Sequence, residues 1–177
     1  MGVATFFTVG HGTLPAATFV ALVRDAGLGA IVDVRRFPGS RHNPQFGKDE
    51  IRRSLAGVGV EYRWMPALGG RRKGSPGSPN VALRNPQFRA YADHMSSDEF
   101  AAGVTELLGL ASTLSLAVMC SEAVWWRCHR RLLADHLVLV TGQSVQHLFH
   151  DGRLAEHPIT PGARGGDGHV VYDSAPA

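Results

Sequence analysis

The chain has 177 residues, 44% hydrophobic and 19% charged, which predicts one globular domain rather than a disordered or multidomain protein. No apolar run approaches the roughly 20 residues that a membrane helix needs, and the first residues lack the basic region of a signal peptide. Two cysteines are too few for a disulfide framework in a chain of this size. We therefore expect free thiols and a cytoplasmic protein with no membrane partner.

The charge of the chain is unevenly distributed. From Arg35 to Lys73, ten basic residues accompany three acidic ones, a net charge of +7, and because the total is +3 the rest of the chain carries −4. Sixteen of the 18 basic residues are arginine, whose planar fork matches phosphate and carboxylate groups. This pattern favours a phosphate-bearing partner, with solvated side chains from an arginine-rich coding bias as the alternative.

Hydrophobic periodicity predicts strands and helices in alternation. In chain order we expect a strand at 6–9, a helix at 18–26, a strand at 30–34, a helix at 48–56, a strand at 60–64, helices at 87–95 and 98–110, a strand at 114–119, a helix at 128–140 and a strand at 145–149. This order predicts an α/β fold, a single domain with a mostly parallel, Rossmann-like sheet flanked by helices on both faces.

Two segments are too rich in Gly and Pro for regular structure. Residues 68–86 interrupt the domain, which we place at residues 1–157, and we expect them to form a mobile flap. Residues 158–177 are expected to form a C-terminal tail that frays.

Polar residues follow three of the predicted strands. These groups are Gly10-His11-Gly12, Asp33 with Arg35 and Arg36, and Cys120-Ser121-Glu122. In open α/β sheets, ligands bind beyond the carboxyl ends of the strands, so the three groups should meet at one edge of the sheet. The sequence therefore predicts a single functional site there.

The helix expected from Cys128 adds a fourth contribution. At about 100° per residue, His129 lies in the middle of the apolar face and should point toward the strand ends. Arg130 and Arg131 fall on or near the solvent face, where Asp135 can pair with Arg131.

Ordinary structural roles are the alternative for several of these residues. His129 can be a core histidine, Cys120 and Cys128 can be small buried hydrophobes, and Asp33 can cap a turn. Glu122 is harder to explain in this way, because a carboxylate directly after an apolar strand is costly unless it is paired. The convergence of the four groups favours a functional site.

Several motifs in the same order resemble the domain-of-unknown-function 488 family. They are Thr8-Val9-Gly10-His11-Gly12, residues 31–41 (IVDVRRFPGSR) with Asn43-Pro44-Gln45-Phe46, Leu68-Gly69-Gly70, and Met119-Cys120-Ser121-Glu122 followed by Cys128-His129-Arg130. The resemblance runs from about Phe7 to Phe149. It implies a compact α/β domain with these segments around one pocket, and it implies no particular reaction.

The first functional hypothesis is an enzyme that cleaves an N-glycosidic or phosphodiester bond in nucleic acid or a nucleotide, including base excision of the DNA-repair type. Asp33 or Glu122 would orient a water or stabilise a cationic sugar, while the other holds an arginine, and His11 or His129 would act as proton donor or positioner. The candidates for holding phosphate are Gly10, Gly12, Arg35, Arg36, Arg41, Ser121 and Arg130. The candidates for stacking on bases are Phe37, Phe46, Tyr62, Trp64 and Trp126, with core packing as the alternative for each.

The second hypothesis is metal- or thiol-dependent catalysis by Cys120, Glu122, Cys128 and His129, with His11 as a further possible ligand. Cys128 and His129 are adjacent and diverge by about 100° on a helix, so we predict no metal site and no cofactor, although a divalent metal remains compatible. A thiolate at Cys120 is more credible, because nearby arginines and a helix N-terminus would lower its pKa. The third hypothesis is a non-catalytic anion or nucleic-acid binder, which would need the arginines but neither Glu122 nor His129.

Overall fold

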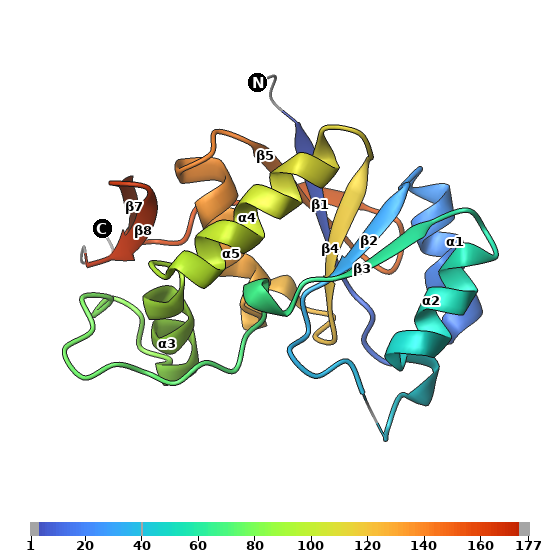
Figure 1. The fold of residues 1–177 in the computed structure, drawn as a ribbon, viewed down its shortest axis with the longest axis horizontal. Coiled ribbons are helices and arrows are strands. Elements are labelled where there is room, and N and C mark those ends of the chain that lie inside the picture. Colours follow the sequence, from blue (N-terminus) through green and yellow to red (C-terminus); the bar gives the residue numbers. More distant parts are fainter. Residues whose placement is uncertain (1–3, 40, 174–177) are drawn as a thin grey trace.

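A six-stranded sheet forms the centre of the molecule. The computed structural model describes residues 4–39 and 41–173, so Ser40 and the last four residues of the tail lie outside it. The strands are β1 (Thr5–Gly10), β2 (Ala30–Asp33), β3 (Glu61–Trp64), β4 (Leu116–Cys120), β5 (Ser144–Leu148) and β6 (Leu154–Glu156), in the order β3-β2-β4-β1-β5-β6. Strands β1 to β5 are mutually parallel and β6 is antiparallel to β5, which confirms the predicted α/β fold (Figure 1).

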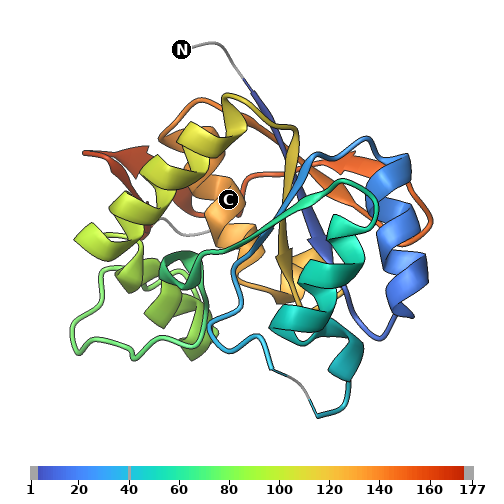
Figure 2. The ribbon, with the colours of Figure 1, turned by 45° about the vertical axis from the view of Figure 1, so that its right-hand side comes forward.

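Helices cover both faces of the sheet. They are α1 (Ala16–Asp25), α2 (Lys48–Ala56), α3 (Pro86–His94), α4 (Asp98–Ala111) and α5 (Arg130–Leu139). Helices α1 and α2 lie on one face, and α3, α4 and α5 lie on the other (Figure 2). No helix among the described residues is long and apolar enough to cross a membrane.

The apolar strands are buried on both faces because each face carries its own hydrophobic cluster. Successive side chains of a strand point to opposite sides. In β2, Ile31 packs with the cluster of α1 and α2, whereas Ala30 and Val32 pack with the cluster of α3, α4 and α5. Burying an aliphatic side chain of this size contributes about 1.5–3 kcal/mol, so the continuous apolar run holds β2 at the centre of the fold.

The connections after β1 and β4 diverge to opposite faces, since β1 leads to α1 and β4 leads to α5. The two strands are neighbours, and the backbone N–H of His11 donates to the Cys120 carbonyl at 3.0 Å. The N–H of Gly12 likewise donates to the Ser121 carbonyl at 3.0 Å. A divergence of this kind opens a crevice at the carboxyl edge, where α/β proteins bind ligands.

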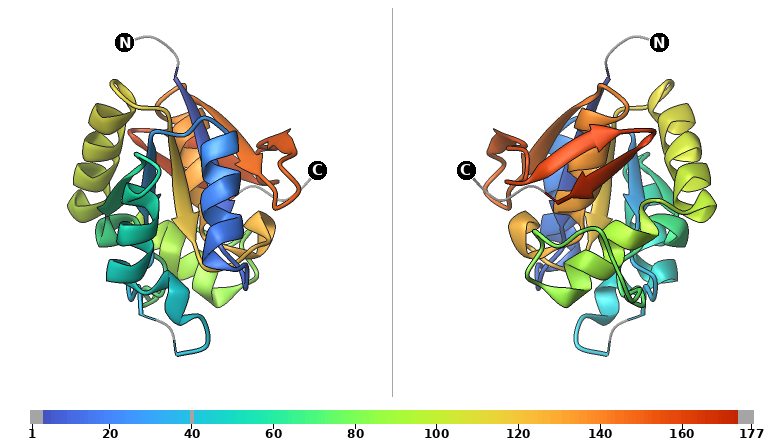
Figure 3. Two further views of the ribbon diagram at one scale, coloured as in Figure 1. Left: turned by 90° about the vertical axis from the view of Figure 1, so that its right-hand side faces the viewer. Right: turned by 90° about the vertical axis from the view of Figure 1, so that its left-hand side faces the viewer.

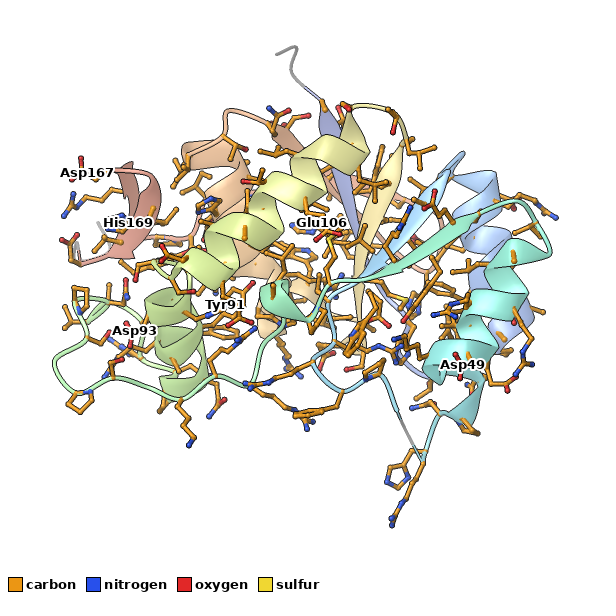
Figure 4. All side chains as sticks on the ribbon, viewed as in Figure 1. Asp49, Tyr91, Asp93, Glu106, Asp167 and His169 are labelled. Carbon is orange, nitrogen blue, oxygen red and sulfur yellow. The ribbon has the colours of Figure 1, made fainter. Side chains whose placement is uncertain are left out.

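The segment between η2 (Pro66–Leu68) and α3 contains no helix or strand, in agreement with the irregular structure expected for the flap. Its contacts run to α3 through Asp93, which accepts hydrogen bonds from the Asn80 side chain and from Ser78 (Figure 4). Asn80 is buried and accepts a hydrogen bond from the backbone of Tyr172. The segment is therefore anchored in its middle, and its mobility stays a prediction.

The C-terminal region corrects the expectation of a fraying tail. Strands β7 (Ala163–Gly166) and β8 (His169–Tyr172) form an antiparallel hairpin, which faces the viewer in the right-hand view of Figure 3. The hairpin packs against α5, and both Val170 and Tyr172 are buried. Each strand has only four residues, and the apolar run Val170-Val171-Tyr172 is too short to stand out from the surrounding glycines.

Candidate active site

A cleft of about 1270 Å³ lies at the carboxyl edge of the sheet. The residues predicted for the site that line it are His11, Gly12, Arg35, Arg36, Phe37, Cys120, Ser121, Glu122 and His129. Sequence reasoning did not single out further lining residues, among them Thr13, Asn43, Gln87, Phe88, Tyr91, Arg127 and His150. They come from loops and from α3, whose positions depend on tertiary packing that no local pattern encodes.

Asp33 stands behind the cleft rather than in it. Its carboxylate is 0% exposed, and it accepts hydrogen bonds from Arg35 Nε (2.9 Å), Arg35 NH2 (2.6 Å) and the Tyr62 hydroxyl (2.6 Å). Both oxygens are therefore occupied by groups of the protein, and Asp33 is the carboxylate of the two candidates that holds an arginine. Its role is to hold Arg35 in a buried, bidentate ion pair that orients the guanidinium at the cleft wall.

His11 is fixed between Arg35 and the ring of Phe46. Its Nδ1–H donates to the Gly12 carbonyl at 2.8 Å, and Arg35 NH1 lies 3.2 Å from Nε2. Burial, with a smaller contribution from the Arg35 charge, lowers the pKa of His11 to about 4. Burial therefore favours the neutral ring near pH 7, which favours the predicted role as a positioner over that of a proton donor.

Most of the predicted stacking residues lie outside the cleft. Phe46 is buried against His11, with 4.0 Å between ring centroids, and Tyr62, whose hydroxyl donates to Asp33, does not line the cleft. Trp64, at the end of β3, donates its indole N–H to the Arg35 carbonyl and does not line the cleft. Trp126 is exposed but does not line the cleft, and neither does Arg41. Phe37 alone of the five lines the cleft, with 64% of its surface exposed.

Arginines dominate the charge of the cleft. Five of them line it, Arg35, Arg36, Arg71, Arg72 and Arg127, and Glu122 is the one acidic residue among the lining residues. Arg35 is paired with Asp33 and Arg72 with Glu99. Within residues 4–39 and 41–173, the other three have no carboxylate partner in an ion pair. The cleft therefore has a surplus of positive charge suited to an anion.

Two thiols meet at the floor of the cleft. Cys120 Sγ lies 2.7 Å from Cys128 Sγ, and Arg130 Nε donates to Cys120 Sγ at 3.1 Å. Burial opposes ionisation of Cys128, but the hydrogen bond from Cys120 and the Arg130 charge outweigh it and lower the pKa of Cys128 to about 6. Burial raises the pKa of Cys120 although Arg130 donates to its sulfur, so ionisation is favoured at Cys128 over the predicted Cys120.

Arg130 is buried, which corrects its expected place on the solvent face. Only 1% of the residue is exposed, and NH2 donates to the Glu122 carbonyl while NH1 donates to Thr8 Oγ1 at 3.3 Å. It does not line the cleft and cannot hold a substrate phosphate directly. Its hydrogen bonds instead position the segment that carries Glu122.

A chain of buried hydrogen bonds continues from Thr8 to the C-terminal hairpin. His147 Nδ1 lies 2.6 Å from Thr8 Oγ1, and His147 Nε2 lies 2.9 Å from His157 Nδ1. His157 Nε2 then lies 2.9 Å from Asp135 Oδ1. With one proton on each histidine ring, every hydrogen bond of the chain has a donor and an acceptor. The chain then runs from the Arg130 guanidinium, as the first donor, to the Asp135 carboxylate, as the last acceptor. Sequence reasoning missed this chain, because its members lie up to 149 positions apart in the sequence and share no local motif.

Asp135 closes that chain and corrects the predicted pairing with Arg131. Its Oδ1 also accepts from the backbone N–H of Thr160 at 2.9 Å, and its Oδ2 accepts from the Tyr172 hydroxyl at 2.8 Å. Arg131 donates instead to Thr160 Oγ1 at 2.7 Å. The hairpin therefore occupies the side of α5 that was expected to face solvent.

His129 lines the cleft beside the thiols, as the helical wheel predicted. Its Nδ1 lies 3.5 Å from Cys128 Sγ, and its ring packs against Tyr91, whose hydroxyl donates to the Leu68 carbonyl. His129 Nε2 is buried and has no hydrogen-bond partner among the described residues. Burial lowers the pKa of His129, so the ring offers a neutral nitrogen to a ligand in the cleft.

Two glycines allow the close approaches that build this site. A Cβ at Gly10 would lie 1.9 Å from the Glu122 carbonyl oxygen, and a Cβ at Gly70 would lie 2.9 Å from His129 Nδ1. Neither distance is tolerable for an ordinary side chain. The glycines themselves were the sequence signal. Gly10 lets β1 approach the loop after β4, and Gly70 lets the flap approach His129.

We compared the chain with models of known protein families. The family model described as "Domain of unknown function DUF488" matches residues 15–137. The chain belongs to the DUF488 family. The DUF488 match includes Asp33, Arg35 and the stretch from Cys120 to Arg130, while His11, His147 and the hairpin lie outside its bounds. No curated protein and no solved structure matched the chain.

Metal ligation was the remaining alternative for the Cys and His residues. Among the described residues, no group of three or more His, Cys, Asp or Glu side chains has an arrangement that could hold a metal ion. Cys120, Cys128 and His129 do meet, but Arg130 Nε donates to Cys120 Sγ at the same place. A guanidinium in contact with the sulfurs disfavours a cation at that place.

Histidines whose pKa is lowered by burial should make the fold sensitive to acid. Burial lowers the pKa of His11 and His136 to about 4 and, with the His157 charge, that of His147 to about 3. The unfolded chain takes up these protons near pH 6.5 and the folded protein does not. The free energy of unfolding should therefore fall between about pH 6.5 and pH 4, by up to about 1.4 kcal/mol per pH unit for each histidine.

Urea unfolding at pH 7 and pH 4.5 measures this dependence. His136→Leu removes one of these groups, and its Nδ1 has no hydrogen-bond partner among the described residues. Between about pH 6.5 and pH 4 the variant should lose up to about 1.4 kcal/mol of pH dependence per pH unit. An unchanged difference between the two pH values in the variant would contradict this assignment.

Proposed function

We propose that the protein is an enzyme that holds a phosphate-bearing substrate, a nucleotide or a nucleic acid, in the cleft and cleaves an N-glycosidic or phosphodiester bond in it. One observation carries the proposal: Glu122 shares the cleft with Arg36, Arg71 and Arg127, for which the described residues supply no carboxylate partner. A set of unpaired guanidinium groups is suited to phosphate oxygens. A carboxylate among them is suited to a reacting centre rather than to phosphate.

The roles follow from position. The unpaired arginines bind phosphate, and Phe37 offers an exposed aromatic face to a base at the rim of the cleft. Glu122 accepts a proton from the attacking water or stabilises positive charge on a sugar in the transition state. Glu122 Oε1 also accepts the Val124 N–H at 3.1 Å, which fixes the carboxylate and leaves Oε2 for substrate. His129 Nε2 positions the substrate through the hydrogen bond that it does not make within the protein.

The bond that is cleaved can be identified with labelled oligonucleotides. Single- and double-stranded oligonucleotides with normal and damaged bases would be incubated with the enzyme and read before and after hot alkali, with and without a divalent cation. Cutting that depends on alkali would identify cleavage of the N-glycosidic bond, and direct cutting would identify a phosphodiesterase. Binding without cutting under every condition would contradict an enzyme and favour the non-catalytic binder.

Removing one unpaired arginine should weaken binding in a characteristic way. Arg127→Ala removes one phosphate contact, so binding of single-stranded DNA should weaken uniformly across sequences, and the slope of log K against log salt should decrease by about 0.7. Arg24→Ala is the matched control, because Arg24 is exposed, paired with Asp25 and located in the last turn of α1 at the opposite edge of the sheet. Fluorescence anisotropy at several salt concentrations measures both. An unchanged slope for Arg127→Ala would exclude this arginine from phosphate binding.

The proposed compartment is the cytoplasm. Cys120 and Cys128 are free and in contact, and thiols so placed stay reduced in a reducing compartment.

A further inference from the structure

The two cysteines at the floor of the cleft have the arrangement of a reactive pair. Cys120 ends β4, Cys128 immediately precedes the segment that enters α5, and their sulfur atoms are 2.7 Å apart. Both residues line the cleft, so a small molecule that enters it can reach them. The proposed cleavage reaction uses neither sulfur.

The buried charge of Arg130 requires an anion nearby. Ionised groups in a protein interior are stable only when they are paired. Among the described residues no carboxylate forms an ion pair with Arg130, and its partners are Cys120 Sγ, the Thr8 hydroxyl and the Glu122 carbonyl. The remaining group that can supply a full negative charge at this place is a cysteine thiolate.

The surroundings assign different states to the two thiols. The hydrogen bond from Cys120 and the Arg130 charge lower the pKa of Cys128 to about 6, although burial opposes this. Burial raises the pKa of Cys120, which remains a protonated donor to Cys128. His129 Nδ1, 3.5 Å from Cys128 Sγ, is a further donor to the thiolate. Cys128 is therefore the nucleophile, and Cys120 is the thiol that lies beside it.

We propose that Cys128 and Cys120 form a thiol redox centre that reduces small hydroperoxides and closes an intramolecular disulfide. The Cys128 thiolate attacks the outer oxygen of ROOH, the O–O bond breaks, and the alkoxide takes a proton from solvent to give ROH and Cys128–SOH. Cys120 then attacks Cys128 Sγ, the S–O bond breaks, and hydroxide leaves as water with the proton of Cys120. Two thiols and one hydroperoxide thus yield a disulfide, an alcohol and water.

Little rearrangement is needed for the second step. A disulfide has an S–S distance of about 2.05 Å, so the sulfur atoms need to approach by less than about 1 Å. Arg130 lies beside both reacting groups and favours the thiolate during the first step. A small external thiol restores the reduced pair. The inference is independent of the phosphate-bearing substrate, because it concerns only the floor of the cleft.

Thiol counting on the wild-type protein tests the proposal without any substitution. The native protein would be treated with equimolar hydrogen peroxide, denatured, alkylated with N-ethylmaleimide and weighed by mass spectrometry. We expect the oxidised protein to carry no alkyl group on either cysteine and to form no covalent dimer. After reduction with dithiothreitol, both cysteines should be alkylated. Retention of both alkyl groups, or conversion of the cysteines to sulfinic acids without a disulfide, would overturn the proposal.

Two variants separate the roles of the sulfur atoms. In Cys120→Ser the reaction should stop at the sulfenic acid, which dimedone would trap on Cys128. In Cys128→Ser the rate of peroxide consumption should fall about tenfold or more. A Cys128→Ser protein that consumes peroxide at the wild-type rate would overturn the assignment of Cys128 as the nucleophile. Circular dichroism of both variants, and the wild-type thiol count, distinguish a chemical effect from misfolding.

Discussion

Replacing Asp135 with alanine should lower the free energy of unfolding by about 3–5 kcal/mol. Its carboxylate is 0% exposed and accepts hydrogen bonds from three buried groups, the His157 ring, the Thr160 backbone and the Tyr172 hydroxyl. Each donor left without an acceptor costs about 1–3 kcal/mol. The loss should be large, because Asp135 and all three donor residues are buried.

Urea denaturation followed by circular dichroism measures the effect of Asp135→Ala. Asp25→Ala is the control, since Asp25 is exposed and forms an ion pair with Arg24 at 2.8 Å on the surface. Such surface pairs contribute about 0–1 kcal/mol. A loss below about 1 kcal/mol for Asp135→Ala would mean that the hairpin does not depend on this carboxylate.

The same substitution should reach the active site through the buried chain. Asp135 holds His157, and the chain continues through His147 and Thr8 to Arg130, which binds the backbone of Glu122. The C-terminal hairpin, outside the family match, is thus connected to the cleft by this chain of hydrogen bonds as well as by its packing on α5. We therefore expect Asp135→Ala to disturb the position of the Glu122 segment as well as the core.

The sheet and its helices could be predicted from the sequence because their signals are local. The predicted helix at 48–56 coincides with α2 (Lys48–Ala56), where an amphipathic pattern follows a glycine. The apolar runs of β2 and β4 are buried along their whole length, so no alternation was needed to recognise them as strands. The site could then be predicted from one topological rule, because the polar groups after β1, β2 and β4 share the carboxyl edge.

The errors around α5 have one physical cause. The helical wheel assumed solvent on the side away from the sheet, but the β7–β8 hairpin covers that side. Seven of the ten residues of α5 are buried, including Arg130 and Asp135. The hairpin is a contact between residues far apart in sequence, and it was missed, so the polar residues of α5 were assigned to the surface.

Asp33 shows a second limit of sequence reasoning. The strand-end rule located the residue correctly near the site, but it does not distinguish a side chain that faces substrate from one that supports its neighbour. The choice depends on Arg35 and Tyr62, which surround the carboxylate only after β2 and β3 pair. Of the two candidate carboxylates, the structure leaves Glu122 in the cleft.

Glu122→Gln should lower the rate of bond cleavage by about 10²–10⁴-fold, because the amide keeps the size of the side chain but cannot accept the proton or offset positive charge. The affinity for substrate should be retained or rise slightly, since the arginines remain and a negative charge is removed. Glu106→Gln is the matched control: Glu106 is an exposed residue of α4, remote from the lining of the cleft (Figure 4).

The most direct test of the account is a single-turnover cleavage assay with saturating enzyme and the oligonucleotide or nucleotide that the wild-type protein cleaves. Saturation removes binding from the measured rate, so the comparison of wild type, Glu122→Gln and Glu106→Gln reports on the chemical step. We predict that Glu122→Gln alone loses cleavage while it still binds the substrate. Cleavage by Glu122→Gln at the wild-type rate would contradict the assignment of this cleft as the active site.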